Sequence, residues 1–165
     1  MPLSKIDSDS LNSGVPTRAQ LPAGSVLQVV QAINTTQYDG TSGAEAALFN
    51  FSITPTSASS KVLIFVSLSA GVIGTFGNYA LSLRLRRGTT TAGTLLDFCR
   101  FGQYAAGTQI NRELYGSVFF CGLDTPSTAS AQSYCVTVQN IDGGASYQFN
   151  SNGAQSNMVL MEIAA

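Results

Sequence analysis

Residues 62–70 decide the fold of this chain, and they read Val62-Leu63-Ile64-Phe65-Val66-Ser67-Leu68-Ser69-Ala70. Every second residue from Val62 to Ala70 is apolar, which is the pattern of a β-strand with one face on a hydrophobic core. At the start of the segment, Leu63 and Phe65 make the opposite face apolar as well. The segment therefore predicts a central strand that is covered on both faces where it begins.

Eight other segments show β patterns of differing strength, separated by turn residues at intervals of roughly 8–15 residues. Pro55 stops one of them, Asp142-Gly143-Gly144 reads as a tight turn, and Asn34–Gly43 reads as a loop. No window of about 11 residues holds a helical period, so helix is expected to be scarce. The pattern predicts an all-β, antiparallel β-sandwich or jelly roll over residues 25–165. The further predicted strands are Ser25–Ala32, Leu48–Ile53, Tyr79–Arg86, Leu95–Phe101, Glu113–Cys121, Tyr134–Gln139, Ser146–Phe149 and Met158–Ile163.

The composition narrows the range of functions. Only 10% of the 165 residues are charged, against about 25% in an average soluble domain, and 44% are hydrophobic. A formal net charge of −1 lacks the basic surface that nonspecific nucleic-acid binding requires. Because histidine is absent, Ser-His and Cys-His catalytic pairs and histidine-ligated zinc are excluded, and we expect no cofactor. The charge deficit indicates that other copies of the chain cover part of the surface.

The carboxylates do not suggest an active site. Asp97, Glu113, Asp124 and Asp142 lie on different segments, whereas a glycosidase needs two carboxylates placed together. The glycine-rich run Gly71–Gly77 has no following Lys-Ser/Thr and no helix, so it reads as a loop or bulge rather than a phosphate cradle. We therefore expect that the protein is not an enzyme.

Arg84, Arg86 and Arg87 form the main concentration of charge in the sequence. Planar guanidinium groups match carboxylates, so one interpretation is an anion site, such as a subsite for a sialic-acid-like sugar. The other interpretation places them on the solvent side of a strand, paired with acids at a subunit boundary.

Aromatic residues form a second candidate surface for a ligand or a subunit contact. Tyrosine suits either a sugar-stacking surface or a core and interface, because its ring packs while its hydroxyl stays hydrogen-bonded. The residues concerned are Tyr104, Tyr115, Tyr147 and Phe149.

The cysteines and the N-terminus indicate the cellular compartment in which the protein is made. Cys99, Cys121 and Cys135 are widely spaced and odd in number, so neither a metal knuckle nor a disulfide framework is indicated. We expect three reduced cysteines used as small buried hydrophobes, with oxidation of one pair outside a reducing cell left open. The N-terminus has no secretory apolar segment, and Val62–Phe76 is too short and too interrupted to span a bilayer. We expect a protein made in a cytoplasm and soluble there, without membrane insertion.

Residues 1–24 differ from the rest and form a predicted extended N-terminal arm. They are polar and Ser-rich, with three prolines, and their apolar residues follow neither a helical nor a strand period. Isolated apolar side chains on an extended chain suit small pockets on a partner, so we expect the arm to dock onto another protein. The candidate docking residues are Leu3, Ile6, Leu11 and Val15.

Three segments of the chain carry a resemblance. They are Leu21-Pro22-Ala23-Gly24-Ser25-Val26-Leu27-Gln28-Val29-Val30, the run from Phe51-Ser52-Ile53-Thr54-Pro55 through Ser59-Ser60-Lys61-Val62-Leu63-Ile64, and the closing Met158-Val159-Leu160-Met161-Glu162-Ile163. Together they resemble a group of bacteriophage virion proteins, mostly tail-fibre or structural proteins, many from phages of aquatic hosts. The resemblance implies a β-rich, typically trimeric appendage domain that follows a short N-terminal arm, and it implies no catalytic residues.

The favoured function is that of a phage virion structural protein of the tail-fibre type. Such a protein docks to the particle by its N-terminal arm and presents a trimeric β head, so its location is the virion. The expected partners are further copies of the chain, other virion proteins and a glycan on the host surface. The alternatives are a capsid decoration protein, present in many more copies per particle, and a free carbohydrate-binding module.

Overall fold

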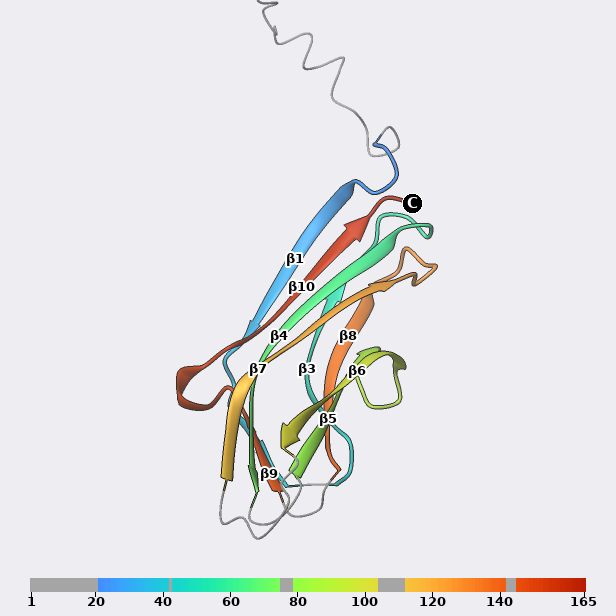
Figure 1. The fold of residues 1–165 in the computed structure, drawn as a ribbon. Coiled ribbons are helices and arrows are strands. Elements are labelled where there is room, and N and C mark those ends of the chain that lie inside the picture. The colour runs from blue at the N-terminus through green and yellow to red at the C-terminus, as the bar shows by residue number, and fades with distance from the viewer. Residues whose placement is uncertain (1–20, 42, 75–78, 104–111, 142–144) are drawn as a thin grey trace, which may run out of the picture.

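The computed structural model describes residues 21–41, 43–74, 79–103, 112–141 and 145–165. These residues form two antiparallel sheets that pack face to face (Figure 1). No helix among them is long and apolar enough to cross a membrane. The elements are β1 (Val26–Asn34), β2 (Tyr38–Gly40), β3 (Ala46–Ile53), β4 (Lys61–Gly74), β5 (Tyr79–Arg87), β6 (Thr94–Gln103), β7 (Arg112–Asp124), β8 (Gln132–Asn140), β9 (Ala145–Phe149), a 3-10 turn (Ser151–Gly153) and β10 (Ser156–Ile163).

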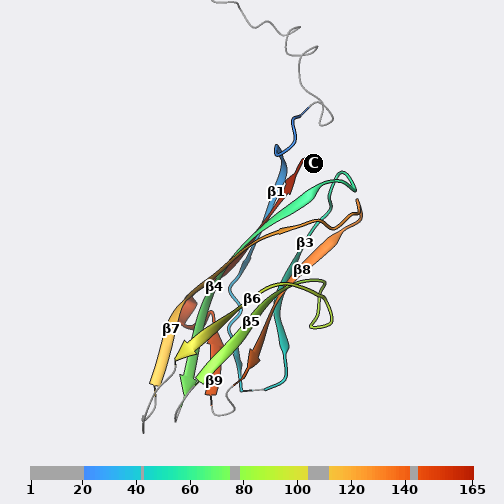
Figure 2. The same cartoon turned by 45° about the vertical axis from the view of Figure 1, so that its right-hand side comes forward.

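The order of the strands is that of a jelly roll. The six-stranded sheet has the order β1-β10-β4-β9-β2, with β7 also paired to β4, and the four-stranded sheet has the order β3-β8-β5-β6. The long strand β4 pairs with β7 on one side, and on its other side with β10 and then with β9. The chain crosses repeatedly between the two layers, which Figure 2 shows from the side. The predicted all-β sandwich is therefore confirmed.

The core lies between the sheets and is made by alternate residues of the central strands. On β4 every second residue from Val62 to Val72 is buried, and on β5 the same holds from Leu81 to Leu85. Burial of one such side chain contributes about 1.5–3 kcal/mol relative to exposure, so these strands supply much of the stability. The inward faces that strand alternation predicts for β4 and β5 are confirmed.

Two elements differ from the sequence prediction. The expected loop Asn34–Gly43 contains β2, which pairs with β9 from Tyr38 to Gly40. The expected loop or bulge at Gly71–Gly77 begins as strand, because β4 stays in register with β7 as far as Gly74. The ring of Tyr115 occupies the space that a Cβ on Gly71 would take, so a glycine there allows the strand to continue. Residues 75–77 of the expected loop lie outside the described residues.

The arm is described only from Leu21 onward, and its predicted docking residues Leu3, Ile6, Leu11 and Val15 lie outside the described residues. The chain that leads into β1 is tied to the C-terminal end. Gly24 N–H donates to Ala164 O at 2.9 Å, and Ala164 N–H donates to Ser25 O at 2.9 Å. The start of β1 and the C-terminus therefore lie together at one end of the sandwich (Figure 1).

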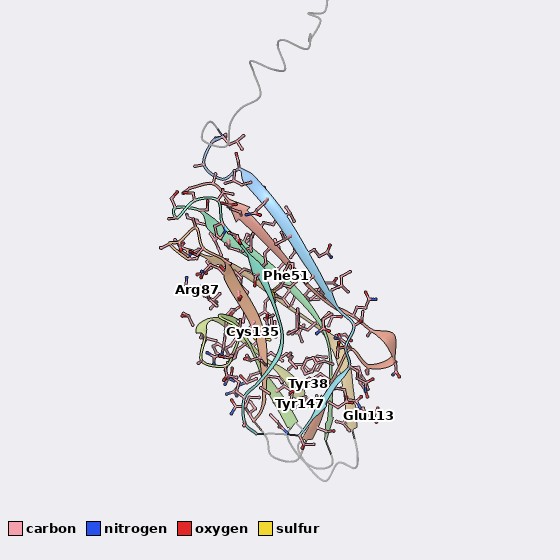
Figure 3. All side chains as sticks on the ribbon, turned by 180° about the vertical axis from the view of Figure 1, so that it is seen from behind. Tyr38, Phe51, Arg87, Glu113, Cys135 and Tyr147 are labelled. Carbon is pink, nitrogen blue, oxygen red and sulfur yellow. The ribbon has the colours of Figure 1, made fainter. Side chains whose placement is uncertain are left out.

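One tyrosine of β2 and one of β9 form an aromatic pair. Tyr38 of β2 and Tyr147 of β9 have nearly parallel rings, with centroids 6.1 Å apart and an interplanar angle of 3° (Figure 3). Tyr147 is 1% exposed, and a Cβ added at Gly40 would lie 2.5 Å from its Oη atom. The absence of a side chain at Gly40 thus lets β2 pass directly over the buried tyrosine.

Replacing Gly40 by alanine should lower the free energy of unfolding by about 1–3 kcal/mol, because Tyr147 must then move within a packed core. Urea denaturation measures this loss. Gly122→Ala is the matched control, since a Cβ there meets Leu85 at an ordinary 3.6 Å and should change stability by less than about 1 kcal/mol. Equal losses in the two variants would contradict this account of Gly40.

Candidate interaction surfaces

The outer side of the six-stranded sheet carries an uncharged surface, which we call the apolar face. The strand registers place its side chains in three rows across β1, β10, β4 and β7. Because the residues between them point into the core, these side chains point away from it. The rows are Val29, Met161, Leu63 and Leu123; Gln31, Val159, Phe65 and Cys121; and Ile33, Asn157, Ser67 and Phe119.

The nonpolar side chains of this face are unusually exposed. Phe119 is 71% exposed and Leu123 60%, and a hollow of about 290 Å³ lies beside Phe119, Phe65 and Val159. Twelve outward positions, each taking up about 4.8 Å across the sheet and ~6.6 Å along a strand, cover on the order of 400 Å². That area lies within the ~300–600 Å² that the largest apolar patch of a monomer usually covers, and patches of this size often mark interaction sites. The apolar face is therefore a candidate interaction surface.

Among the described residues, charged side chains flank the apolar face only at its two ends. Lys61 is exposed at one end, where β4 begins. At the other end Glu113 is exposed opposite Ile73, and Asp39 pairs with Gln148 on the neighbouring strand. A nonpolar centre between polar ends is the usual anatomy of a subunit contact.

The three described residues of the predicted sugar-stacking surface do not form one exposed surface. Tyr147 and Phe149 are buried in the core, because pairing with β4 turns these residues of β9 inward. Tyr104 lies outside the described residues. Tyr115 is exposed at the acidic end of the apolar face, and its hydroxyl donates to Gln148 Oε1 at 3.1 Å. The core interpretation therefore holds for Tyr147 and Phe149.

Two of the clustered arginines share one carboxylate on the outer side of the four-stranded sheet. Arg86 donates to both oxygens of Glu45, at 2.7 and 2.9 Å, and Arg84 Nη1 lies 3.1 Å from Glu45 Oε2. Burial alone would raise the pKa of Glu45, but hydrogen bonds from Arg86 and Thr137 and the charge of Arg84 hold it below its usual range. Arg84 and Arg86 therefore lie on one face and are already paired with an acid.

Arg87 faces the other way along β5 and links the two sheets. Its Nη1 lies 3.2 Å from both carboxylate oxygens of Asp124 at the end of β7. Tyr134 Oη on β8 donates to the same carboxylate at 2.8 Å, and burial together with Asp124 raises the pKa of this hydroxyl far above its usual value. Strand alternation is the signal in the sequence that separates Arg87 from Arg84 and Arg86.

Phe98 is an exposed aromatic residue that sequence reasoning misses. It is 60% exposed on β6, which forms one edge of the four-stranded sheet. The segment Leu95–Phe101 alternates only weakly, so the sequence alone does not say which of its residues face outward. The register with β5 places Phe98 opposite Arg84, and Arg100 opposite Ser82, on the outer side.

The three cysteines are unpaired thiols. Burial raises the pKa of Cys135 to about 11, and burial together with Asp97 raises the pKa of half-buried Cys99. Cys121 is exposed on the apolar face, so the prediction of a buried hydrophobe is wrong for this residue, because β7 turns it outward opposite Phe65. In the part of the chain that the structure describes, no three His, Cys, Asp or Glu side chains are grouped to hold a metal ion.

A buried carboxylate organises the end of the sandwich where the arm begins. Glu162 of β10 is fully buried and accepts four hydrogen bonds, each from a neutral donor. The donors are Thr56 N–H at 2.6 Å and Thr56 Oγ1, Ser60 Oγ and Gln28 Nε2 at 2.7 Å. Burial alone would raise the pKa of Glu162, but the bonds from Thr56, Ser60 and Gln28 outweigh it and hold the pKa below its usual range.

The three segments that carry the resemblance meet at this carboxylate. Gln28 comes from the first segment, Thr56 and Ser60 from the second, and Glu162 from the third. Gln28 Nε2 also donates to Thr54 O at 2.7 Å. Glu162 thus fastens β1, the turn before β4 and β10 together at the root of the arm.

No protein-family model and no curated protein matches this chain. Similar solved structures include the VP2 subviral particle of infectious bursal disease virus, at 14% identity with a TM-score of 0.37, and the Gt strain of that virus, at 13% with a TM-score of 0.39. These matches cover 84% and 92% of this chain but 37% and 42% of the viral chains, so this chain spans less than half of their length. The C-terminal domain of EclA, a sugar-binding protein, is 15% identical with a TM-score of 0.40, over 92% of this chain and 96% of that one. Likeness this weak is no guide to function.

Glu162→Gln should lower the free energy of unfolding at pH 7 by about 2–3 kcal/mol, because a side-chain amide then faces buried donors. The pKa of Glu162 is lower in the folded chain, so the carboxylate stabilises fully above its unfolded pKa of about 4.3 and loses this effect as the pH falls through the folded pKa. In urea denaturation, the difference between wild type and variant should therefore stay constant from about pH 7 to pH 5 and shrink as the pH falls further. Glu113→Gln, at an exposed site, should change stability by less than about 0.5 kcal/mol. A difference for Glu162→Gln that stays constant with pH would contradict an ionised carboxylate at this position.

Proposed function

We propose that this chain is a non-enzymatic structural protein of a bacteriophage particle. In this proposal it is a tail-fibre-type module that forms a homotrimer through its apolar face and attaches to the particle by residues 1–24. The observation that carries the proposal is the apolar face, where twelve outward positions on four strands hold no charge. The outward residues of a solvated antiparallel sheet are usually polar, whereas most of these are nonpolar. We infer that another molecule covers this face.

A second copy of the chain is the partner that fits this face best. Strand β4 has nonpolar side chains on both sides at its start, and the four-stranded sheet covers only one of them, leaving Phe65 39% exposed. The area of the face, on the order of 400 Å², would supply about half of the ~800 Å² that each partner contributes to a standard interface. A chain with only 10% charged residues also has few other ways to remain soluble than to cover such a face in an assembly.

The phage assignment and the three-fold state rest on the resemblance of the three segments that meet at Glu162. This buried carboxylate and the bonds between Gly24 and Ala164 give the arm a fixed starting point. A rigid origin reduces the entropy that is lost when an extended segment docks on a partner, which suits an attachment arm.

A capsid decoration protein would need the same covered face, and its copy number distinguishes it from a fibre protein. Quantitative mass spectrometry of purified particles counts the copies. A few dozen copies or fewer support the tail-fibre assignment, and hundreds of copies support decoration of the capsid.

Combining Phe119→Ser with Leu123→Ser should convert the assembly into monomers, because each buried nonpolar side chain contributes about 1.5–3 kcal/mol to an interface. Light scattering after size exclusion should give the wild type three times the 17.2 kDa of one chain, and the variant a single chain. Phe98→Ser, which changes an exposed phenylalanine on the other sheet, should keep the wild-type mass.

The thiol of Cys121 reports on the same face, because it is exposed there in the single chain. This thiol should be shielded from a thiol reagent in the wild-type assembly and react readily in the double variant. Cys99 and Cys135 should react slowly in both proteins, since their raised pKa values disfavour the thiolate. A monomeric wild type with a reactive Cys121 at micromolar concentration would contradict assembly through the apolar face.

A chain starting at Leu21 should keep its β circular-dichroism spectrum and its oligomeric mass, because the described bonds at the root of the arm begin at Pro22 and Gly24. It should fail to appear in particles when it replaces the full-length protein. Immunoblotting of purified particles measures incorporation. Normal incorporation would place the attachment on the β-sandwich instead, and an unfolded truncated chain would make the arm part of the folding unit.

A further inference from the structure

The outer side of the four-stranded sheet, opposite to the apolar face, carries a small hollow of different chemistry. The hollow measures about 270 Å³ and lies between the edge strand β6 and its neighbour β5. Its lining combines nonpolar surface, one hydroxyl and two guanidinium groups. The residues are Leu95, Phe98, Ile141, Ser82, Arg84 and Arg100.

The sheet register brings an exposed aromatic ring and two cations together. Phe98 lies directly across from Arg84, and Arg100 lies across from Ser82. Residues two apart on a strand stand about 6.6 Å from each other, and directly opposed residues about 5 Å. One sugar ring with an acidic substituent can therefore touch Phe98 and Arg100 at the same time.

Among the described residues, positive charge predominates around this hollow. Of these residues, Arg84, Arg86 and Arg100 share the outer face with the carboxylate of Glu45. Glu45 is engaged by Arg84 and Arg86, whereas Arg100 is exposed and makes no ion pair with a described residue. The nearby carboxylate of Asp97 accepts a hydrogen bond from the Phe98 N–H at 2.8 Å.

Arg84 lines the hollow and is held by neighbouring side chains. Its Nη2 donates to Gln139 Oε1 at 2.9 Å. Its buried Nη1 lies 3.1 Å from Glu45 Oε2 but is not aligned with it as a hydrogen bond, so Nη1 has no hydrogen-bond partner among the described residues. Arg84 therefore adds positive charge beside the hollow, and Arg100 is the cation that is exposed to a ligand there.

We propose that this hollow binds an acidic saccharide, with the sugar ring against Phe98 and its carboxylate or sulfate on Arg100, next to the positive charge of Arg84. The flat ring of Phe98 offers nonpolar surface to the C–H face of a pyranose, and Ser82 offers a hydroxyl to its polar edge. Guanidinium groups bind planar anions through paired, charge-assisted hydrogen bonds, so the acidic group directs the ligand to one orientation. This site is independent of the apolar face and goes beyond a structural role in the particle.

The test uses the full-length protein and measures saccharide binding by ligand-observed NMR titration. The probes are trigalacturonic acid, 3′-sialyllactose and a sulfated chondroitin disaccharide, with lactose and galactotriose as neutral counterparts. At least one acidic probe should bind with a Kd on the order of 1 mM, at least about tenfold more tightly than the neutral probes, and added salt should weaken it.

Variants identify the residues that bind. Arg100→Gln and Phe98→Ala should each weaken binding by about tenfold or more, while Phe98→Tyr, which keeps a ring, should retain it. Lys61→Gln removes an exposed cation from the opposite sheet and should leave binding unchanged. The oligomeric mass of each variant should equal that of the wild type, so a failure of assembly is recognised separately.

Three results would overturn the proposal. One is no binding of any acidic probe at concentrations up to about 20 mM. Another is equal affinity for acidic and neutral probes. The third is an unchanged affinity in Arg100→Gln, because it would place the anion elsewhere.

Discussion

The rest of this structure depends on strand β4, because it carries nonpolar side chains on both of its faces and both faces favour burial. Its inward residues, from Val62 to Val72, form the centre of the core and are covered by the four-stranded sheet. Its outward residues Leu63 and Phe65 continue through the registers with β10 and β7 into the apolar face. One run of sequence therefore explains the sandwich and also provides the physical basis for proposing that a second copy covers the outside.

At the end of the sandwich where the arm begins, the buried carboxylate of Glu162 holds the surrounding segments together. Burying an ion is unfavourable, and here four neutral donors from Thr56, Ser60 and Gln28 offset that loss around Glu162. These donors come from segments far apart in the chain, so the carboxylate fixes β1, β10 and the turn before β4 against one another. The chain has few charged residues, and the carboxylate of Glu162 serves to hold the root of the arm.

The sequence was sufficient to predict which residues of a strand face the core wherever apolar and polar residues alternate. The inward faces of β4, β5 and β8 follow directly from alternate apolar residues, as at Leu81, Leu83 and Val136. The same rule applied strictly to β5 also sends Arg87 away from Arg84. The three-residue strand β2 could not be predicted from the sequence. Its pairing with β9 depends on Gly40 passing over Tyr147, which is a contact between distant segments.

Surfaces were harder to predict than the core. Whether Tyr147 lies inside or outside depends on how β9 pairs with β4, and the exposure of Phe98 depends on its place on an edge strand. Neither fact is encoded in the local pattern of residues. The apolar face likewise arises from the lateral order β1-β10-β4-β7, which joins residues that are scattered along the sequence.

Hydroxyl-radical footprinting of the wild-type protein tests the central claim most directly, since it compares two phenylalanines that are similarly exposed in a single chain. Phe119 on the apolar face is 71% exposed and Phe98 on the opposite sheet is 60% exposed. If copies of the chain cover the apolar face, Phe119 should be oxidised several-fold more slowly than Phe98 at micromolar concentration, and the difference should vanish on dilution to the monomer. Equal oxidation of the two residues in the assembled protein would contradict the account.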